Sequence, residues 1–202
     1  MSKHNAKNER IKHKYFDHLK EASGKSEATV DAVAKALDRF EADTKHLDFS
    51  RFHPNKAKAF KRRLAEQRGR RSGQPLSKAT QYSTLKNLKR FFVWLAGQPG
   101  YKSRLKYSDA DYFNLSEKDT RIATANLDRA GPTLEQIKYV ISTMPENSEI
   151  EKRDRALIAF TLLTGARDSA IASMKLKHVD LVADKAIQDA RDVDTKNSKT
   201  FI

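Results

Sequence analysis

Residues 157–180 read LIAFTLLTGARDSAIASMKLKHVD and combine two helical patterns around a glycine. The apolar run before Gly165 predicts a buried helix, and the spacing of Ile171 and Met174 predicts a second, short helix. Arg167 falls at the junction between them. A guanidinium held there binds a phosphate or a carboxylate bidentately, because its planar fork matches two oxygens and stays charged. The stretch therefore predicts an anion-binding arginine between two helices.

The residues around this stretch extend the pattern into a mixed α and β segment. Thr133 and Gln136 have the spacing of a capping box, which predicts a helix that begins there and stops at Pro145. The buried helix is expected over about 150–163. Short strands are expected at the end of the chain, at Val179–Val182, Ala186–Gln188 and Thr200–Ile202.

The first half of the chain is helical in pattern. After a polar tail at 1–8, helices are predicted at 9–22, 27–43, 54–67 and 78–96. The second has Val30, Val33, Ala34, Leu37 and Phe40 on one face behind Ser26, a residue type that caps helices. Residues 115–131 lack a clear period and are interpreted as a linker. The expected domains are thus 9–114 and 132–202.

Positive charge is concentrated in one segment. The chain has 40 Lys plus Arg against 26 Asp plus Glu, a net charge of +14. Sixteen of the basic residues and only one acid, Glu66, lie between Arg51 and Ser108. A folded segment with a single-sign surface favours a polyanionic partner. Nucleic acid is the expected partner.

Other composition features set the class of protein. The chain has no cysteine, which excludes disulfides and thiolate metal sites. The N-terminus lacks the apolar core of a signal peptide, and no stretch approaches the ~18 apolar residues of a membrane span. We therefore expect a cytoplasmic protein with no membrane partner.

Several enzyme classes are not supported by the motifs. The six histidines never occur at i, i+4 with a carboxylate between them, as a metal-hydrolase helix requires. Gly69 and Gly73 lack the Gly-Lys-Ser/Thr ending of a phosphate-binding loop. No metal or cofactor is expected.

The chain resembles the tyrosine recombinases, the phage-integrase family of DNA strand-exchange enzymes. The resemblance is carried by residues 157–180, by LSKATQYSTLKNLKRFFVWL at 76–95, and by RAGPTLEQIKYVISTMP at 129–145. It implies a mainly α fold, in which a four-helix core-binding (SAM-like) bundle precedes the first part of an α+β catalytic domain with a small β-sheet. It covers about residues 9–202.

The resemblance also implies roles for particular residues. In this family a tyrosine attacks a DNA phosphodiester and forms a 3′-phosphotyrosine, with neither metal nor nucleotide required. Arg167 matches the first catalytic arginine, and Lys196 lies where the family has the lysine that protonates the leaving oxygen, with Lys199 as the fallback. One departure is Ala170, where the family usually has an acid that steadies the arginine. Asp168 and Asp180 are the alternatives for that role.

The family's His-x-x-Arg pair and tyrosine nucleophile follow the hairpin that carries the lysine. All six tyrosines precede Arg167 and are interpreted as core or boundary aromatics, so the chain is expected to be a truncated recombinase that binds DNA and is inactive alone. The expected DNA-binding residues are Lys56, Lys58, Lys61, Arg62, Arg63, Arg68, Arg70, Arg71, Lys78, Lys86 and Arg90.

Two other functions remain open. The first is a helical DNA-binding or architectural protein without enzymatic ancestry, in which the Arg167 segment is structural. The second is a regulator that pairs with other recombinase protomers on DNA. The target site and the oligomeric state do not follow from the sequence.

Overall fold

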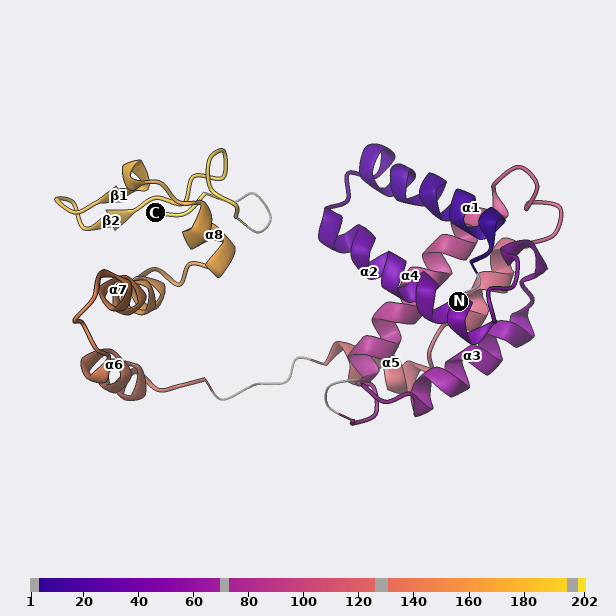
Figure 1. The fold of residues 1–202 in the computed structure, drawn as a ribbon, viewed down its shortest axis with the longest axis horizontal. Coiled ribbons are helices and arrows are strands. Elements are labelled where there is room, and N and C mark those ends of the chain that lie inside the picture. The colour runs from indigo at the N-terminus through magenta and orange to yellow at the C-terminus, as the bar shows by residue number, and fades with distance from the viewer. Residues whose placement is uncertain (1–3, 70–72, 126–130, 196–199) are drawn as a thin grey trace. The chain divides into compact units, whose positions relative to one another are not determined.

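The protein is mainly helical, with one small antiparallel sheet (Figure 1). The computed structural model describes residues 4–69, 73–125, 131–195 and 200–202. The chain divides into unit 1, residues 1–127, and unit 2, residues 128–202. The boundary between the two units falls inside the stretch interpreted as a linker.

The described residues of unit 1 form five α-helices connected by short 3₁₀ and π segments. The α-helices are α1 (Ala6–Asp17), α2 (Glu27–Asp43), α3 (Pro54–Glu66), α4 (Lys78–Ala96) and α5 (Glu117–Thr124). The short segments are η1 (His18–Ala22), a π-helix, and two 3₁₀ helices, η2 (Phe49–Arg51) and η3 (Tyr107–Phe113). The first four helices confirm the four helical patterns, with small shifts at their ends.

Apolar faces of the helices form the core of unit 1. Ala57, Phe60 and Leu64 of α3 are buried, as are Leu85 and Leu88 of α4. Phenylalanines from α2, η2, α4 and η3 meet at the centre, where the rings of Phe52 and Phe92 stack with centroids 4.1 Å apart. Aromatic side chains from segments far apart in sequence therefore hold the unit together.

The polar tail predicted at 1–8 is wrong at its C-terminal end. Helix α1 begins at Ala6, and Asn5 caps it by accepting hydrogen bonds from the backbone N–H groups of Lys7 and Asn8. Asn8 is fully buried. Polar side chains suggested a solvated tail, but amide side chains also cap helices and satisfy buried backbone groups.

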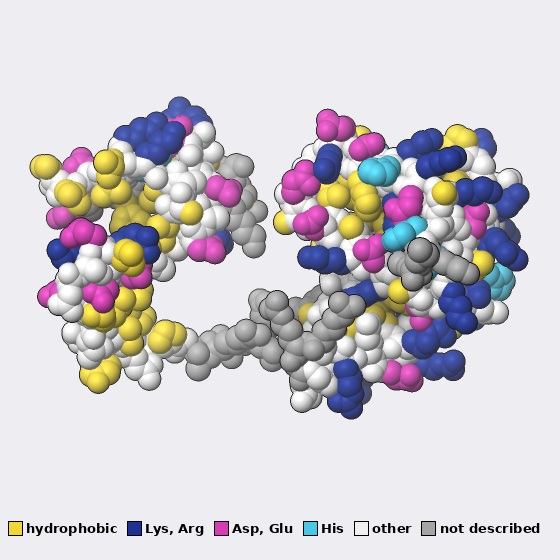
Figure 2. Space-filling model, viewed as in Figure 1, with side chains coloured by type: hydrophobic (Ala, Val, Ile, Leu, Met, Phe, Trp, Pro, Cys, Tyr) yellow, Lys and Arg dark blue, Asp and Glu magenta, His cyan; other side chains and the backbone are white. Residues whose placement is uncertain are grey.

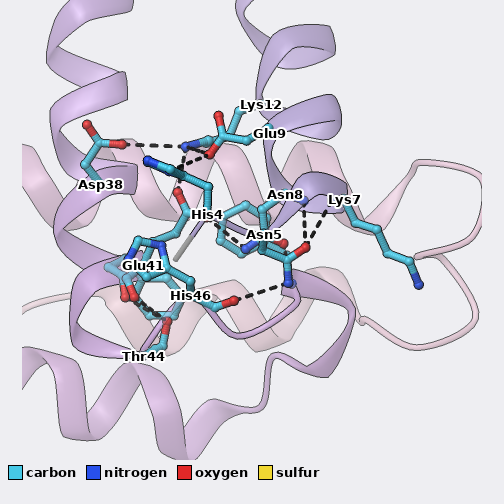
Figure 3. Close-up of polar contacts among 12 residues, drawn as sticks. His4, Asn5, Lys7, Asn8, Glu9, Lys12, Asp38, Glu41, Thr44 and His46 are labelled. Carbon is cyan, nitrogen blue, oxygen red and sulfur yellow. Dashed lines mark hydrogen bonds and ion pairs between the residues drawn. The ribbon is translucent and has the colours of Figure 1, made fainter. Parts of the chain in front are cut away.

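A buried polar cluster fixes α1 against α2 (Figure 3). Glu41 of α2 accepts hydrogen bonds from Lys12 Nζ at 2.7 Å and from Asn8 Nδ2 at 2.8 Å. The Oδ1 atom of Asn8 accepts from the backbone N–H of Phe49 at 3.0 Å. These contacts join α1, α2 and the start of η2.

Helix α5 occupies part of the predicted linker, so the interpretation of 115–131 as a linker throughout is wrong. Ser116 caps α5 by accepting from the Asp119 backbone N–H, and Lys78 Nζ of α4 lies 3.0 Å from the Asp119 carboxylate. Leu115 is partly buried against the core. This short helix has no buried side chain, which explains why its pattern was weak.

Unit 2 contains shorter elements. They are α6 (Leu134–Thr143), α7 (Glu149–Thr164), α8 (Asp168–Ser173), the 3₁₀ helix η4 (Leu176–His178), β1 (Val179–Asp180) and β2 (Lys185–Ala186). The capping box of Thr133 and Gln136 is present, and Gly165 ends α7 with φ 61°. A left-handed φ is inexpensive for glycine, which explains the break after the apolar run.

The expected β segment is present but short. Strands β1 and β2 pair antiparallel, Val179 with Ala186 and Asp180 with Lys185. Gln188 and Phe201 add one isolated bridge. In the turn between the strands, the Asp180 carboxylate accepts hydrogen bonds from the backbone N–H groups of Val182 and Ala183.

The buried helix predicted at 150–163 is a helix, but it is not buried. No side chain of α7 is buried, and Leu163 is 84% exposed. Yellow hydrophobic side chains are visible over α6 and α7 in Figure 2. An apolar run gives a helix a face that can be buried, but burial also needs a second surface to pack against. Within the described residues of unit 2, little packs on α7 besides α6.

None of the helices in the described part of the chain combines the length and apolar character that crossing a membrane requires.

Candidate nucleic-acid interface

Five of the expected DNA-binding residues lie on helix α3, yet three of these five side chains are engaged. Three contacts hold them: Lys58 Nζ over the Tyr112 ring at 4.8 Å, Lys61 Nζ to the Asn114 carbonyl oxygen at 2.7 Å, and the Arg63 guanidinium to the Asp43 carboxylate. Partial burial lowers the pKa of Lys61, and the nearby Lys58 lowers it further. These three side chains therefore brace α3 against its neighbours.

The other expected DNA-binding residues include some with intramolecular contacts and some without. Intramolecular contacts hold Arg68 at the Gly73 carbonyl oxygen, Lys78 at Asp119 and Lys86 over the Tyr82 ring at 5.5 Å. Lys56, Arg62 and Arg90 are exposed and make no side-chain hydrogen bond or ion pair with another described residue. Arg70 and Arg71 lie outside the described residues.

A groove of about 1070 Å³ lies beside α4 in unit 1. Its walls come from the end of α1, η1, the start of α2, α4 and α5. Helix α4 contributes its solvent face, where Tyr82, Lys86, Arg90 and Val93 recur at helical spacing opposite the buried stripe. We call this feature the α4 groove.

Positive side chains surround the α4 groove. Among the described residues, its lining includes five cations but only one carboxylate, that of Glu117. The cations are Lys25, Lys86, Lys89, Arg90 and Arg121. Lys89 is paired with Asp111 at 2.7 Å, and Arg121 lies 3.7 Å from Glu117. Lys25 and Arg90 make no such pair within the described residues. The groove is therefore suited to an anionic ligand.

Aromatic side chains line the same groove. Trp94 is half-buried, with its ring centroid 4.8 Å from that of Tyr15 and 6.0 Å from that of the exposed His18. Burial raises the pKa of Tyr15 to about 12, although the positive charge of Arg90 acts in the opposite direction. The phenol of Tyr15 is therefore neutral at neutral pH and adds no negative charge to the groove.

Sequence reasoning identified Lys86 and Arg90 but missed other groove residues. Lys25 and Arg121 lie outside the basic segment, and His18 was placed in a helix without a role. The polar spacing along α4 was an available signal, because it marks one solvent face of the helix. No sequence signal shows that η1 and α5 close against that face.

Arg167 lies in unit 2 as an exposed N-cap residue of α8. It lines a second groove of about 1120 Å³, whose lining also includes Lys185 of β2, the carboxylates of Asp180 and Asp184, and apolar side chains such as Phe160 and Leu163. Within the described residues the guanidinium makes no side-chain hydrogen bond or ion pair. The arginine is thus available to an anionic ligand.

Neither acid considered as a substitute steadies Arg167. Asp168 accepts from the backbone N–H of Ser169, and Asp180 accepts from backbone N–H groups of its own turn. Ala170 itself is buried, with 2% of its surface exposed. A carboxylate at that position needs a polar partner, since burying an unpaired charge is costly.

The remaining expected site residues have different outcomes. Lys196 and Lys199 lie outside the described residues. Tyr15 is buried, as expected of a core aromatic, but Tyr107 and Tyr139 are 63% and 69% exposed. The interpretation of every tyrosine as a core or boundary aromatic is therefore wrong for these two. Tyr107 lies at the exposed start of η3, which buries Ala110 and Phe113 instead, and Tyr139 lies on α6, which has no buried side chain.

Comparison of the chain with protein-family models, with curated proteins and with solved structures finds no match.

Proposed function

We propose that the protein binds double-stranded DNA through unit 1, with the rim of the α4 groove in contact with the phosphates. The observation that supports this best is the excess of cations over carboxylates around the groove. Two of those cations, Lys25 and Arg90, are unpaired within the described residues. Phosphate contacts supply most non-specific DNA affinity and release counterions.

The test is binding of the 202-residue chain to a fluorescent 20-base-pair duplex at several salt concentrations. If about five cations meet phosphates, the log–log slope of affinity against salt is roughly −4 to −5. Replacing Lys25 and Arg90 together by alanine makes the slope shallower by about two. The affinity of this double variant falls roughly tenfold near 100 mM salt.

A matched control removes the same charge elsewhere. Arg10 and Lys14 are exposed on α1, do not line the α4 groove and make no side-chain pair within the described residues. Replacing both by alanine changes the log–log slope by less than about 0.5, the equivalent of half a phosphate contact. Equal losses in the two double variants contradict the groove assignment, and a salt-independent affinity contradicts the proposed function.

We further propose that the chain is part of a tyrosine recombinase of the cytoplasm. In this proposal unit 1 is the SAM-like core-binding bundle and unit 2 is the first part of the catalytic domain. What supports it is the resemblance of the sequence, together with an exposed, unpaired Arg167 at a helix junction. Arg167 and Lys196 then act on the scissile phosphate, and other protomers bind the same DNA.

The recombinase assignment is tested by reading the frame that follows Ile202. The proposal expects a His-x-x-Arg motif and a tyrosine within the next ~150 residues, about one domain. The alternative is a non-catalytic helical DNA-binding protein, which requires neither motif. In the 202-residue chain, Arg167→Ala leaves duplex affinity within about twofold, since many cations share ground-state binding.

A further inference from the structure

The α4 groove carries aromatic side chains that duplex DNA does not use. Bases in a duplex are paired and stacked on each other, so a protein ring stacks only on bases that are unpaired. Yet His18 is exposed and the half-buried Trp94 lines the groove beside it, with the ring planes inclined by 31°.

Cations are placed to hold a single strand along these rings. Lys25 follows η1 and Arg90 lies one turn before Trp94 on α4, and both line the groove. Proteins that bind single strands combine a positive groove with aromatic side chains in this way, and stacking is tolerant of base identity. The volume of about 1070 Å³ lies just above the range of about 300–1000 Å³ for small-molecule sites, as suits a longer ligand.

We propose that the α4 groove binds unpaired nucleotides of DNA, whose bases stack on His18 and Trp94 while Lys25 and Arg90 contact their phosphates. This inference rests on the proposed DNA-binding function and narrows its substrate to DNA with a frayed or displaced strand. Duplex phosphates contact the rim, and unpaired bases enter the groove.

Trp94 is the single tryptophan of the chain, so its fluorescence reports the groove directly. The 202-residue chain is titrated with a 12-nucleotide oligo(dT), with a 20-base-pair duplex, and with the same duplex bearing five unpaired thymidines. Oligo(dT) and the tailed duplex are expected to quench Trp94 emission, and the tailed duplex to bind at least fivefold more tightly than the blunt one. The blunt duplex binds with little quenching.

Histidine variants locate the stacking. His18→Ala is expected to weaken oligo(dT) binding by roughly tenfold, the effect of one lost stacking partner, and to change blunt-duplex affinity by less than twofold. His13 is exposed on α1 and does not line the groove, so His13→Ala is the matched control and changes neither affinity. Because His18 is itself exposed, its replacement leaves the core intact.

The outcomes separate the two proposals. Salt-dependent duplex binding without tighter binding of the tailed duplex overturns the inference and leaves the proposed function standing. Oligo(dT) binding that neither quenches Trp94 nor responds to His18→Ala overturns the groove as its site. Failure to bind any of the three DNAs overturns both proposals.

Discussion

At the scale of single residues, the stability of unit 1 depends on charge buried away from water. Glu41 is 1% exposed, and it accepts hydrogen bonds from Lys12 and Asn8. Burial lowers the pKa of Lys12, but hydrogen bonds to Glu41 and Glu9 outweigh it, so the pKa is raised overall. Such a cluster makes the packing of α1 on α2 specific, since each member must be satisfied.

Removing the Glu41 carboxylate is therefore expected to lower the stability of the protein strongly. Glu41→Ala leaves the Lys12 ammonium buried without its closest partner and lowers the free energy of unfolding by about 3–5 kcal/mol. Asp38→Ala is the control, because Asp38 is 69% exposed and lies 3.6 Å from the same ammonium. Its cost is below about 1 kcal/mol. Urea unfolding followed by far-ultraviolet circular dichroism measures both, and similar losses contradict the buried role of Glu41.

Tyr15 makes the fold sensitive to alkaline pH. Its pKa is raised by burial from 10.0 to about 12 in the folded protein. Because the folded protein favours the neutral phenol, the contribution of Tyr15 to stability is complete below pH 10. It is lost as the pH rises from 10 toward 12. Tyr15→Phe has no phenol to ionise and loses less stability between pH 9 and 11.5. Tyr107→Phe, at an exposed site, follows the wild type in the same urea-unfolding series.

At the scale of elements, α4 separates two roles on opposite faces. Leu85, Leu88 and Phe92 are buried in the core, whereas Lys86 and Arg90 line the groove. The period of 3.6 residues per turn produces this division. Helix α4 thus carries three of the five cations that line the groove, Lys86, Lys89 and Arg90, and the backbone N–H groups at its N-terminus need a cap.

Two serine N-cap residues test how much a helix cap contributes to the free energy of unfolding. Ser77 Oγ accepts from the Thr80 backbone N–H at 3.2 Å, whereas Ser26, the N-cap residue of α2, makes no such bond. Each hydroxyl also contacts a threonine hydroxyl three residues on, which makes the pair well matched. Ser77→Ala costs about 1 kcal/mol of unfolding free energy, and Ser26→Ala less than about half of that. Equal costs in urea unfolding refute the assignment of the Ser77 cap.

At the scale of the whole molecule, the two units differ in how much they bury. The core of unit 1 is complete within its own helices, but unit 2 leaves Leu157, Leu163 and Leu181 largely exposed. A unit with few buried apolar side chains opens more readily. Unit 1 is therefore expected to carry most of the stability of the chain.

Two fragments measure this difference. Residues 1–127 are expected to unfold cooperatively, with a urea midpoint close to that of the first unit in the full chain. A fragment that ends at residue 115 lacks α5, together with the Lys78–Asp119 pair, and has a lower midpoint. It also lacks Glu117 and Arg121 from the wall of the α4 groove. Identical midpoints for the two fragments contradict a structural role for α5.

The sequence by itself determined the elements whose signals are local. Apolar residues at helical spacing marked α2, α3 and α4, and the capping box at Thr133 marked the start of α6. Gly165 marked the end of α7. Periodicity, caps and a left-handed glycine depend only on residues close together in the chain, so they can be recognised in the sequence alone.

Only the tertiary structure decided which side chains are free and which are buried. It engaged Lys58, Lys61 and Arg63 with groups distant in sequence, and it placed Lys25 and Arg90 in the lining of one groove. It also left the apolar face of α7 exposed. These outcomes depend on which surfaces meet in the folded chain. The order of charged residues does not determine which group a cation contacts, and the apolar residues of a helix do not determine which element packs on them.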